Sequence, residues 1–283
     1  CLGRGLAGIK ANNDVSQAYL NYYLKFSKSQ LNTFSQGSTF TAINSGDLKG
    51  IQVALPSYQL QEYVGNILGV IDQDIAKTDQ IIQKNEILKQ GIVIHLFEKA
   101  GKDSAWQMVK LDTITHKITD GTHKTPKYIE TGVPFLRIND IRNYPIDWDN
   151  TNHISETEHK ELIKRCKPER GDILLSKNGT IGITRIVSWD QEFSIFVSLC
   201  LIKPDLNKVL SGYLSVVIGS DFVIQQVKKR SKQGTVTNLH LEEIRDFDIP
   251  LPDKREQQRI ISMIQSIDSK LANEKGYKDH LND

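Results

Sequence analysis

Residues 57–99 read SYQLQEYVGNILGVIDQDIAKTDQIIQKNEILKQGIVIHLFEK. Apolar side chains recur in this stretch at steps of three, four or their multiples: Leu60, Val64, Leu68, Ile71, Ile75, Ile82, Leu88, Ile92 and Leu96. Such spacing forms one stripe of a helix and approaches the heptad pattern of a coiled coil. The stretch predicts a helix roughly 65 Å long, at about 1.5 Å rise per residue. A stripe of this length has no core of its own, so it needs a partner helix.

An internal repeat supplies that partner. Four segments recur at offsets of 194 to 197 residues: Ala18-Tyr19-Leu20 as Gly212-Tyr213-Leu214, Gln36-Gly37-Ser38-Thr39 as Gln233-Gly234-Thr235-Val236, Leu55-Pro56 as Leu251-Pro252, and Ile71-Asp72 as Ile267-Asp268. The helix after Pro56 therefore has a counterpart from Arg255 onward. The stripe of that counterpart consists of Ile260, Ile264, Ile267 and Leu271. We expect the two helices to form an antiparallel coiled-coil spacer, with Thr78 and Asn85 as the polar positions that fix its register.

The segment between the two helices, residues 104–254, predicts a domain of the α/β (α+β) class, because short β-rich runs alternate with helical patterns. The expected strands cover residues 133–138, 172–176, 181–187 and 193–202, and the expected helices cover 156–165 and 209–229. Asn178-Gly179 lies between two of the strands. This pair predicts a hairpin, since its turn favours positive φ at both positions.

The predicted organisation has four parts. Residues 1–56 are the C-terminal part of a first, truncated domain, 57–103 the central long helix, 104–254 the second domain, and 255–283 the start of the final helix. The first copy lacks a counterpart of residues 104–193, a stretch of 90 residues. An upstream segment could supply it, or a second chain, or nothing in a silent cassette, and the sequence leaves these three alternatives open.

Composition excludes several classes of protein. Hydrophobic residues make up 39% of the chain and charged residues 25%, which is typical of an ordinary globular protein. No apolar run approaches the roughly 20 residues that a membrane span needs. The three cysteines, Cys1, Cys166 and Cys200, have no CxxC spacing, so they predict free thiols in a reducing cytoplasm. The formal net charge of +2 is too small to indicate a nucleic-acid partner by itself.

The sequence holds no recognisable catalytic constellation. It has neither a glycine-rich methyltransferase cofactor loop with a base-flipping Asn/Asp-Pro-Pro-aromatic loop nor a GxxxxGK[ST] phosphate loop. Pro204-Asp205 and Pro252-Asp253 begin a nuclease pattern, but neither is followed by the Glu-X-Lys that would complete it. The histidines have no metal-ligand spacing. We therefore expect a non-catalytic chain without metal or cofactor of its own.

Three polar segments of the second domain suit recognition of nucleic acid. Residues 120–126 read DGTHKTP, residues 176–180 read SKNGT, and residues 223–240 contain four basic residues and no acidic one. Thr, Asn, Gln, Lys and Arg are the residue types that contact phosphates and base edges. Each segment also has an ordinary explanation, which is turn chemistry for the first two and a solvated helix face for the third. Residues 104–254 hold 21 basic and 20 acidic residues, so a footprint for DNA has to be local.

Several segments resemble one known family. Ile118–Pro126, Gly132–Ile141 and Gly171–Gly182 resemble its target recognition domains, as do Ile249–Pro252 with Gln257–Ile260 and Ile267-Asp268. The family is the DNA specificity (S) subunit of type I restriction–modification systems. The resemblance covers essentially the whole chain, and its motifs are specific in combination and in order.

The resemblance implies two recognition domains held apart by a pair of long antiparallel helices. It also implies a function without chemistry of its own, in which each domain reads one half of a split target in double-stranded DNA. Methyltransferase (modification) subunits would dock on the helices, and endonuclease (restriction) subunits would join them. S-adenosylmethionine, ATP and Mg would then be bound by those partners. Self-association through the helices or the truncated domain is a further expectation.

The predicted DNA contacts come from all three polar segments: Thr122, His123, Lys124, Thr125, Lys177, Asn178, Thr180, Lys228, Lys229, Arg230, Lys232, Gln233 and Thr235. The first two segments would read bases, and the basic run would mainly contact phosphates. Two other functions remain as alternatives. One is a scaffold that binds the modification subunit through its helices but no DNA, and the other is a methyltransferase or nuclease fused in one chain.

Overall fold

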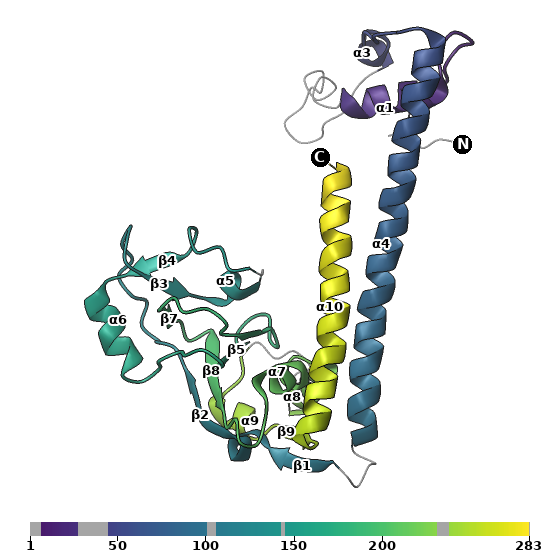
Figure 1. Ribbon diagram of the computed structural model, residues 1–283. Coiled ribbons are helices and arrows are strands. Elements are labelled where there is room, and N and C mark those ends of the chain that lie inside the picture. The colour runs from purple at the N-terminus through teal and green to yellow at the C-terminus, as the bar shows by residue number, and fades with distance from the viewer. Residues whose placement is uncertain (1–6, 28–44, 101–105, 143–144, 231–237, 283) are drawn as a thin grey trace. The chain divides into compact units, whose positions relative to one another are not determined.

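The computed structural model describes residues 7–27, 45–100, 106–142, 145–230 and 238–282 (Figure 1). The chain divides into two compact units, each of which is described by itself. The first unit comprises residues 1–84 and 272–283, and the second comprises residues 85–271. Within the described part of the chain, every helix is too short or too polar to cross a lipid bilayer.

Two long helices, α4 (Tyr58–Ala100) and α10 (Lys254–Asn282), contribute to both units. Each begins within one residue of its predicted start, which confirms the helical spacer as a structural element. In the second unit the two helices run antiparallel, with an ion pair between Lys89 and Asp268. In the first unit the ammonium of Lys278 lies 2.7 Å from a carboxylate oxygen of Asp79.

The first unit also contains α1 (Gln17–Phe26) and α3 (Ser45–Lys49). The side chain of Ser16 caps α1 by accepting a hydrogen bond from the backbone N–H of Tyr19. Helix α1 packs closely on α4 at Gly65, where an added Cβ would lie 2.8 Å from the Cβ of Ala18. The small residue at position 65 therefore sets the distance between the two helices.

The second unit contains three small sheets. The largest has the strand order β2-β8-β5-β6, the next has β4-β3-β7, and the smallest pairs β1 with β9. The strands are β1 (Gln107–Lys110), β2 (Thr115–Asp120), β3 (Val133–Leu136), β4 (Asn152–Ile154), β5 (Ile173–Ser176), β6 (Thr184–Ile186), β7 (Ser194–Ile195), β8 (Leu199–Pro204) and β9 (Asp248–Leu251). The shorter helices of this unit are η1 (Leu111–Ile114), α5 (Ile138–Arg142), α6 (Glu156–Ile163), α7 (Ser211–Ile218), α8 (Asp221–Arg230) and α9 (Leu241–Arg245).

The core of the second unit forms where the ends of the long helices meet the largest sheet. Val93 and Phe97 of α4 are buried there with Ile260 and Ile264 of α10. Tyr213 of α7 is fully buried in the same cluster. The apolar stripe that needed a partner therefore finds both a second helix and a globular core.

The internal repeat is visible as a repeated set of hydrogen bonds, which we call the glutamine anchor. In the first copy, Oε1 of Gln61 accepts from the N–H of Ser16 at 2.9 Å, and its Nε2 donates to the carbonyl of Pro56 at 2.9 Å. In the second copy, Oε1 of Gln257 accepts from the N–H of Leu210 at 2.8 Å, and its Nε2 donates to the carbonyl of Pro252 at 2.9 Å.

A tyrosine strengthens the match between the two copies. The hydroxyl of Tyr19 donates to the carbonyl of Ala54 at 2.7 Å, and the hydroxyl of Tyr213 donates to the carbonyl of Pro250. These partners stand at the same offsets as the repeat in the sequence, which confirms it. Its segment Gln36–Thr39, with the counterpart from Gln233, lies outside the described residues.

Several predicted boundaries were wrong. The helix expected over residues 209–229 is two helices, α7 and α8, because α7 ends at Gly219. The strand expected over 193–202 is divided into β7 and β8 by a turn, in which the N–H of Leu199 donates to the carbonyl of Phe196. Strand β3 ends at Leu136, and β6 covers only Thr184–Ile186.

The predicted hairpin exists, but its turn is longer than expected. Strands β5 and β6 pair antiparallel across residues 177–183. The glycines of this connection, Gly179 and Gly182, have φ values of +70° and +96°. Among the described residues no other residue type has positive φ, so the expectation for Asn178 was wrong.

Candidate nucleic-acid interface

The DGTHKTP and SKNGT loops begin at the same end of the largest sheet, where strands β2 and β5 end. Strands β2 and β5 both pair antiparallel with β8, so they run in the same direction. Asp120 at the end of β2 and Leu175 near the end of β5 are both register partners of Cys200. The two loops that the sequence singled out therefore start on either side of one residue of β8.

A buried carboxylate lies between these loops. The side chain of Asp120 is 4% exposed and contacts a histidine, a lysine and an arginine. Its Oδ2 lies 3.2 Å from Nε2 of His123 and 3.4 Å from Nζ of Lys177, and its Oδ1 accepts from Nη2 of Arg165. We call these four residues the Asp120 cluster. The cluster connects β2, both loops and the segment that follows α6.

The backbone of the first loop is held against β7. Gly121 allows this close approach, because a Cβ at that position would lie 2.0 Å from the carbonyl oxygen of Ile195. The N–H of Thr122 donates to that same carbonyl at 3.1 Å, and the carbonyl of Thr122 accepts from Val197 at 3.0 Å. With the backbone fixed, the side chains of His123, Lys124 and Thr125 are exposed. The structure therefore presents these predicted contacts at the surface.

The second loop is arranged differently from the prediction. The side chain of Lys177 is 6% exposed and faces Asp120, so it is a structural cation in this protein. A direct contact with DNA requires an exposure that this structure does not give it. Its neighbours Asn178, which is half-buried, and Thr180, which is exposed, lie closer to the surface.

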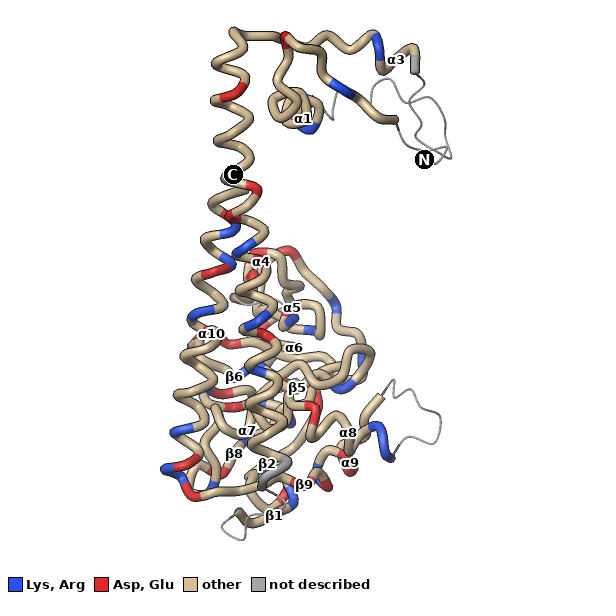
Figure 2. The backbone as a smooth tube through the Cα atoms, turned by 90° about the vertical axis from the view of Figure 1, so that its right-hand side faces the viewer, with Lys and Arg blue, Asp and Glu red and all other residues tan. Residues whose placement is uncertain are grey.

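The third segment is only partly described. Lys228 and Lys229 are exposed at the basic end of α8 (Figure 2). The side chain of Arg230 lies outside the described residues, as do Lys232, Gln233 and Thr235. The chain is described again from Asn238, which bridges to Asn178, and the N–H of Leu239 donates to the carbonyl of Lys177 at 2.8 Å. Asn238 and Leu239, which follow this segment, therefore lie beside the second loop.

Sequence reasoning missed two arginines. Arg142, exposed at the end of α5, donates from Nη2 to the hydroxyl of Thr180 at 3.0 Å. Arg165 follows α6, and its side chain remains 54% exposed while it contacts Asp120. Both lie far in sequence from the loops that they contact, and neither belongs to a motif. A local basic patch with Lys124 is what a nearly neutral domain needs in order to attract phosphate.

Other reactive side chains of the domain are buried. Burial raises the pKa of the Cys166 thiol to about 12 and also raises that of Cys200, so both described thiols stay protonated. Nδ1 of His159 lies 2.9 Å from the hydroxyl of Ser194, but Ser194 is only 1% exposed and no substrate can reach it. Among the described residues, no three His, Cys, Asp or Glu side chains converge as a metal site would require.

Comparison with known proteins places this chain in a family. Residues 2–87 and 103–283 match the family described as the type I restriction modification DNA specificity domain, and the chain belongs to it. The specificity subunit of the type I restriction enzyme EcoBI from Escherichia coli is 23% identical over 266 residues, which cover 84% of this chain and 56% of that protein. The MjaVIII specificity subunit from Methanocaldococcus jannaschii is 21% identical over 95% of this chain and 68% of its own length.

Solved structures share the fold. The S subunit of the type I restriction–modification system from M. genitalium has a TM-score of 0.62 at 18% identity, covering 95% of this chain and 70% of that one. The HsdS subunit from Thermoanaerobacter tengcongensis has a TM-score of 0.57 at 17% identity, covering 95% and 67%. This chain therefore spans about half to two thirds of the length of its relatives.

Proposed function

We propose that this chain is a non-catalytic, sequence-specific DNA-binding subunit that reads one half-site of a bipartite target in double-stranded DNA. One observation carries the proposal, which is that the two loops start side by side at one sheet edge and are joined by the Asp120 cluster. Hydrogen-bonding side chains that read bases have to be held in fixed positions, and this arrangement holds their backbones.

The exposed side chains divide into two classes under this proposal. His123, Thr125 and Thr180 have short polar groups that suit base edges. Lys124, Arg142, Lys228 and Lys229 add exposed positive charge that suits phosphates, and Arg165, whose direction Asp120 fixes, suits a base edge. Lys177 supports the loops from inside. This assignment keeps the predicted loops and moves part of the predicted contact to the two arginines.

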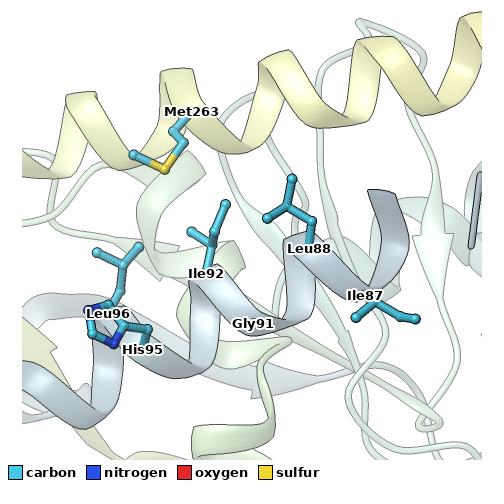
Figure 3. Close-up of a pocket in the computed structure, with 7 residues that line it drawn as sticks. All are labelled: Ile87, Leu88, Gly91, Ile92, His95, Leu96 and Met263. Atoms are coloured by element: carbon cyan, nitrogen blue, oxygen red, sulfur yellow. The ribbon is translucent and has the colours of Figure 1, made fainter. Parts of the chain in front are cut away.

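The long helices would carry the partner subunits. Residues of α4 and Met263 of α10 line an open apolar groove of about 560 Å³ in the second unit (Figure 3). Its lining from α4 consists of Ile87, Leu88, Gly91, Ile92, His95 and Leu96. An apolar groove between two helices suits the side chains of a protein partner. We assign this role to modification subunits, joined by restriction subunits, in a cytoplasmic assembly.

The chemistry would belong to those partners. We expect S-adenosylmethionine, ATP and Mg to bind to the modification and restriction subunits and none of them to bind to this chain. The residues described here supply recognition, because their exposed groups are hydrogen-bond donors, acceptors and cations.

The test begins with the complex of this chain and a modification subunit from the same source. The complex is titrated with random duplex pools at several salt concentrations, and bound sequences are identified. Enrichment of one short half-site is expected. Association with the partner without any enriched sequence would contradict the proposal and favour the scaffold function.

A matched pair of variants then assigns the first loop. His123→Ala should reduce discrimination between the enriched site and other sequences by about 1–3 kcal/mol, as expected for a lost base contact. His116→Ala is the control, since His116 is equally exposed but lies near the start of β2, at the end away from the loop. Lys229→Ala should instead weaken binding to all sequences and reduce the salt slope by about 1. Equal effects of the two histidine variants would remove His123 from the reading surface.

A further inference from the structure

The Asp120 cluster has a feature that an ordinary ion pair lacks. Its single carboxylate contacts basic side chains from three separate segments, which are the first loop through His123, the second loop through Lys177 and the segment after α6 through Arg165. Arg165 is also fixed through its backbone, because Nζ of Lys117 in β2 donates to its carbonyl at 2.6 Å. One buried anion therefore contacts a side chain of each segment, in addition to the main-chain bonds that hold the two loops.

The four residues of the Asp120 cluster differ in exposure, which indicates that the buried ones position the exposed ones. Asp120 and Lys177 are almost fully buried, whereas the side chains of His123 and Arg165 are 65% and 54% exposed. Asp120 cannot touch DNA itself. The groups that it orients are at the surface, and each has a further nitrogen that can form a hydrogen bond beyond the one used on the carboxylate.

The cluster does not include every cation of the surface. Lys124, Lys228 and Lys229 are exposed, and none of them has a described contact with Asp120. Phosphate contacts from these lysines would survive a change at Asp120. Contacts that depend on the fixed directions of His123 and Arg165 would not.

We propose that Asp120 is a specificity-determining positioning residue, which holds both recognition loops and Arg165 in the arrangement that discriminates one DNA sequence from another. This inference rests on the proposed function and deepens it. Loss of the carboxylate should reduce discrimination between sequences and leave non-specific affinity intact. A merely structural role would lower stability without changing the ratio of the two affinities.

The domain offers a matched control. Asp172, at the start of β5, is also buried, accepts from Nζ of Lys203 at 2.6 Å and accepts from the N–H of Glu169 at 2.8 Å. It lies at the opposite end of the strand that leads into the second loop. Asp172→Asn therefore removes the same charge from the same sheet without touching the loops.

The experiment compares Asp120→Asn with Asp172→Asn in the complex of the full chain with its modification subunit. Affinity is measured for the duplex enriched by the unchanged chain and for a scrambled duplex of equal length, together with the salt slope and the unfolding temperature. Asp120→Asn should lower the ratio of the two affinities about tenfold, at an unchanged salt slope. Asp172→Asn should lower the unfolding temperature and leave the ratio within about twofold.

A second variant covers the case in which Asp120→Asn fails to fold. Asp120→Asn combined with Lys177→Gln replaces the buried pair by two neutral amides, so that no charge is left buried alone. The same tenfold loss of discrimination is expected. A retained ratio in this folded double variant would overturn the inference, as would equal losses in Asp120→Asn and Asp172→Asn. If the unchanged chain enriches no sequence, the proposed function fails instead, and the two failures are thereby distinguished.

Discussion

The two copies of the repeat have the same hydrogen bonds in different surroundings. In the second copy, α7 buries Tyr213, Leu214, Val217 and Ile218 beneath the glutamine anchor of Gln257. In the first copy the anchor of Gln61 forms with the same geometry, although none of the ten residues of α1 is buried. The anchor is therefore a local device that fixes the start of each long helix and does not depend on a complete core.

The small residue at the contact between the long and the shorter helix lies on different helices in the two copies. In the first copy the long helix has the small residue, Gly65, which faces Ala18 of α1. In the second copy the shorter helix has it, since Gly212 of α7 faces Ile261 of α10. Both solutions bring the backbones close together. The two copies therefore share the hydrogen bonds of the glutamine anchor, but the small residue at the helix contact lies on the long helix in one copy and on the shorter helix in the other.

The largest expected effect comes from removing the anchors. Gln257 is fully buried, and Gln257→Ala leaves the half-buried N–H of Leu210 and the buried carbonyl of Pro252 without their side-chain partner, so it should cost about 3 kcal/mol of unfolding free energy. Gln61 is also buried, at 2% exposed, but it lies beside α1, which buries no residue, so Gln61→Ala should cost less, about 1 kcal/mol. Urea denaturation measures both. The controls are the exposed neighbours, Gln258→Ala and Gln59→Ala, and equal losses at Gln257 and Gln61 would contradict the difference between the two surroundings.

A smaller effect tests the exchange of apolar volume. Gly65→Ala should destabilise the protein by about 1 kcal/mol, because its Cβ meets a side chain at 2.8 Å and the backbone nitrogen of Tyr19 at 3.0 Å. Gly212→Ala should be nearly neutral, since its Cβ meets only the side chain of Ile261 at 3.1 Å. Thermal unfolding separates them. Gly91→Ala, with open space around it, is the control and should stabilise by up to about 1 kcal/mol through helix propensity.

The smallest expected effect is a pH dependence of the unfolding free energy of the second unit. Burial lowers the pKa of His159 below its ordinary value, so His159 binds a proton more readily in the unfolded chain than in the folded chain. Stability is therefore complete above the ordinary pKa of about 6.5 and falls as the pH drops from there toward the folded pKa, by at most about 1.4 kcal/mol per pH unit. His159→Gln should flatten this dependence in urea titrations between pH 5 and 7. A flat profile in the original chain would show that His159 does not contribute.

The features that the sequence predicted correctly are those that depend on residues close together in the chain. The period of the apolar side chains placed the start of both long helices within one residue, and the repeat identified their pairing. The break between α7 and α8 was missed, because apolar residues continue on both sides of Gly219 and only its cap geometry ends the helix.

The site was predicted in part for the same reason. The two loops are contiguous motifs and were found, but Arg165 stands 45 residues after Asp120 and meets it only through the fold. Lys177 was expected at the surface since lysine is rarely buried without a partner. Its partner is the aspartate that opens the other loop, a pairing that spacing along the chain does not reveal.

One feature of the first loop bears on how such a protein can change its target. Main-chain hydrogen bonds fix the backbone of Gly121 and Thr122 to β7, to β8 and to the turn between them, and the main-chain atoms of Lys177 fix the second loop. The side chains at positions 123, 125 and 180 take no part in those main-chain bonds. Substitutions at positions 125 and 180 can therefore change the exposed groups while these main-chain bonds keep the loops in place, so a new specificity does not require a new fold.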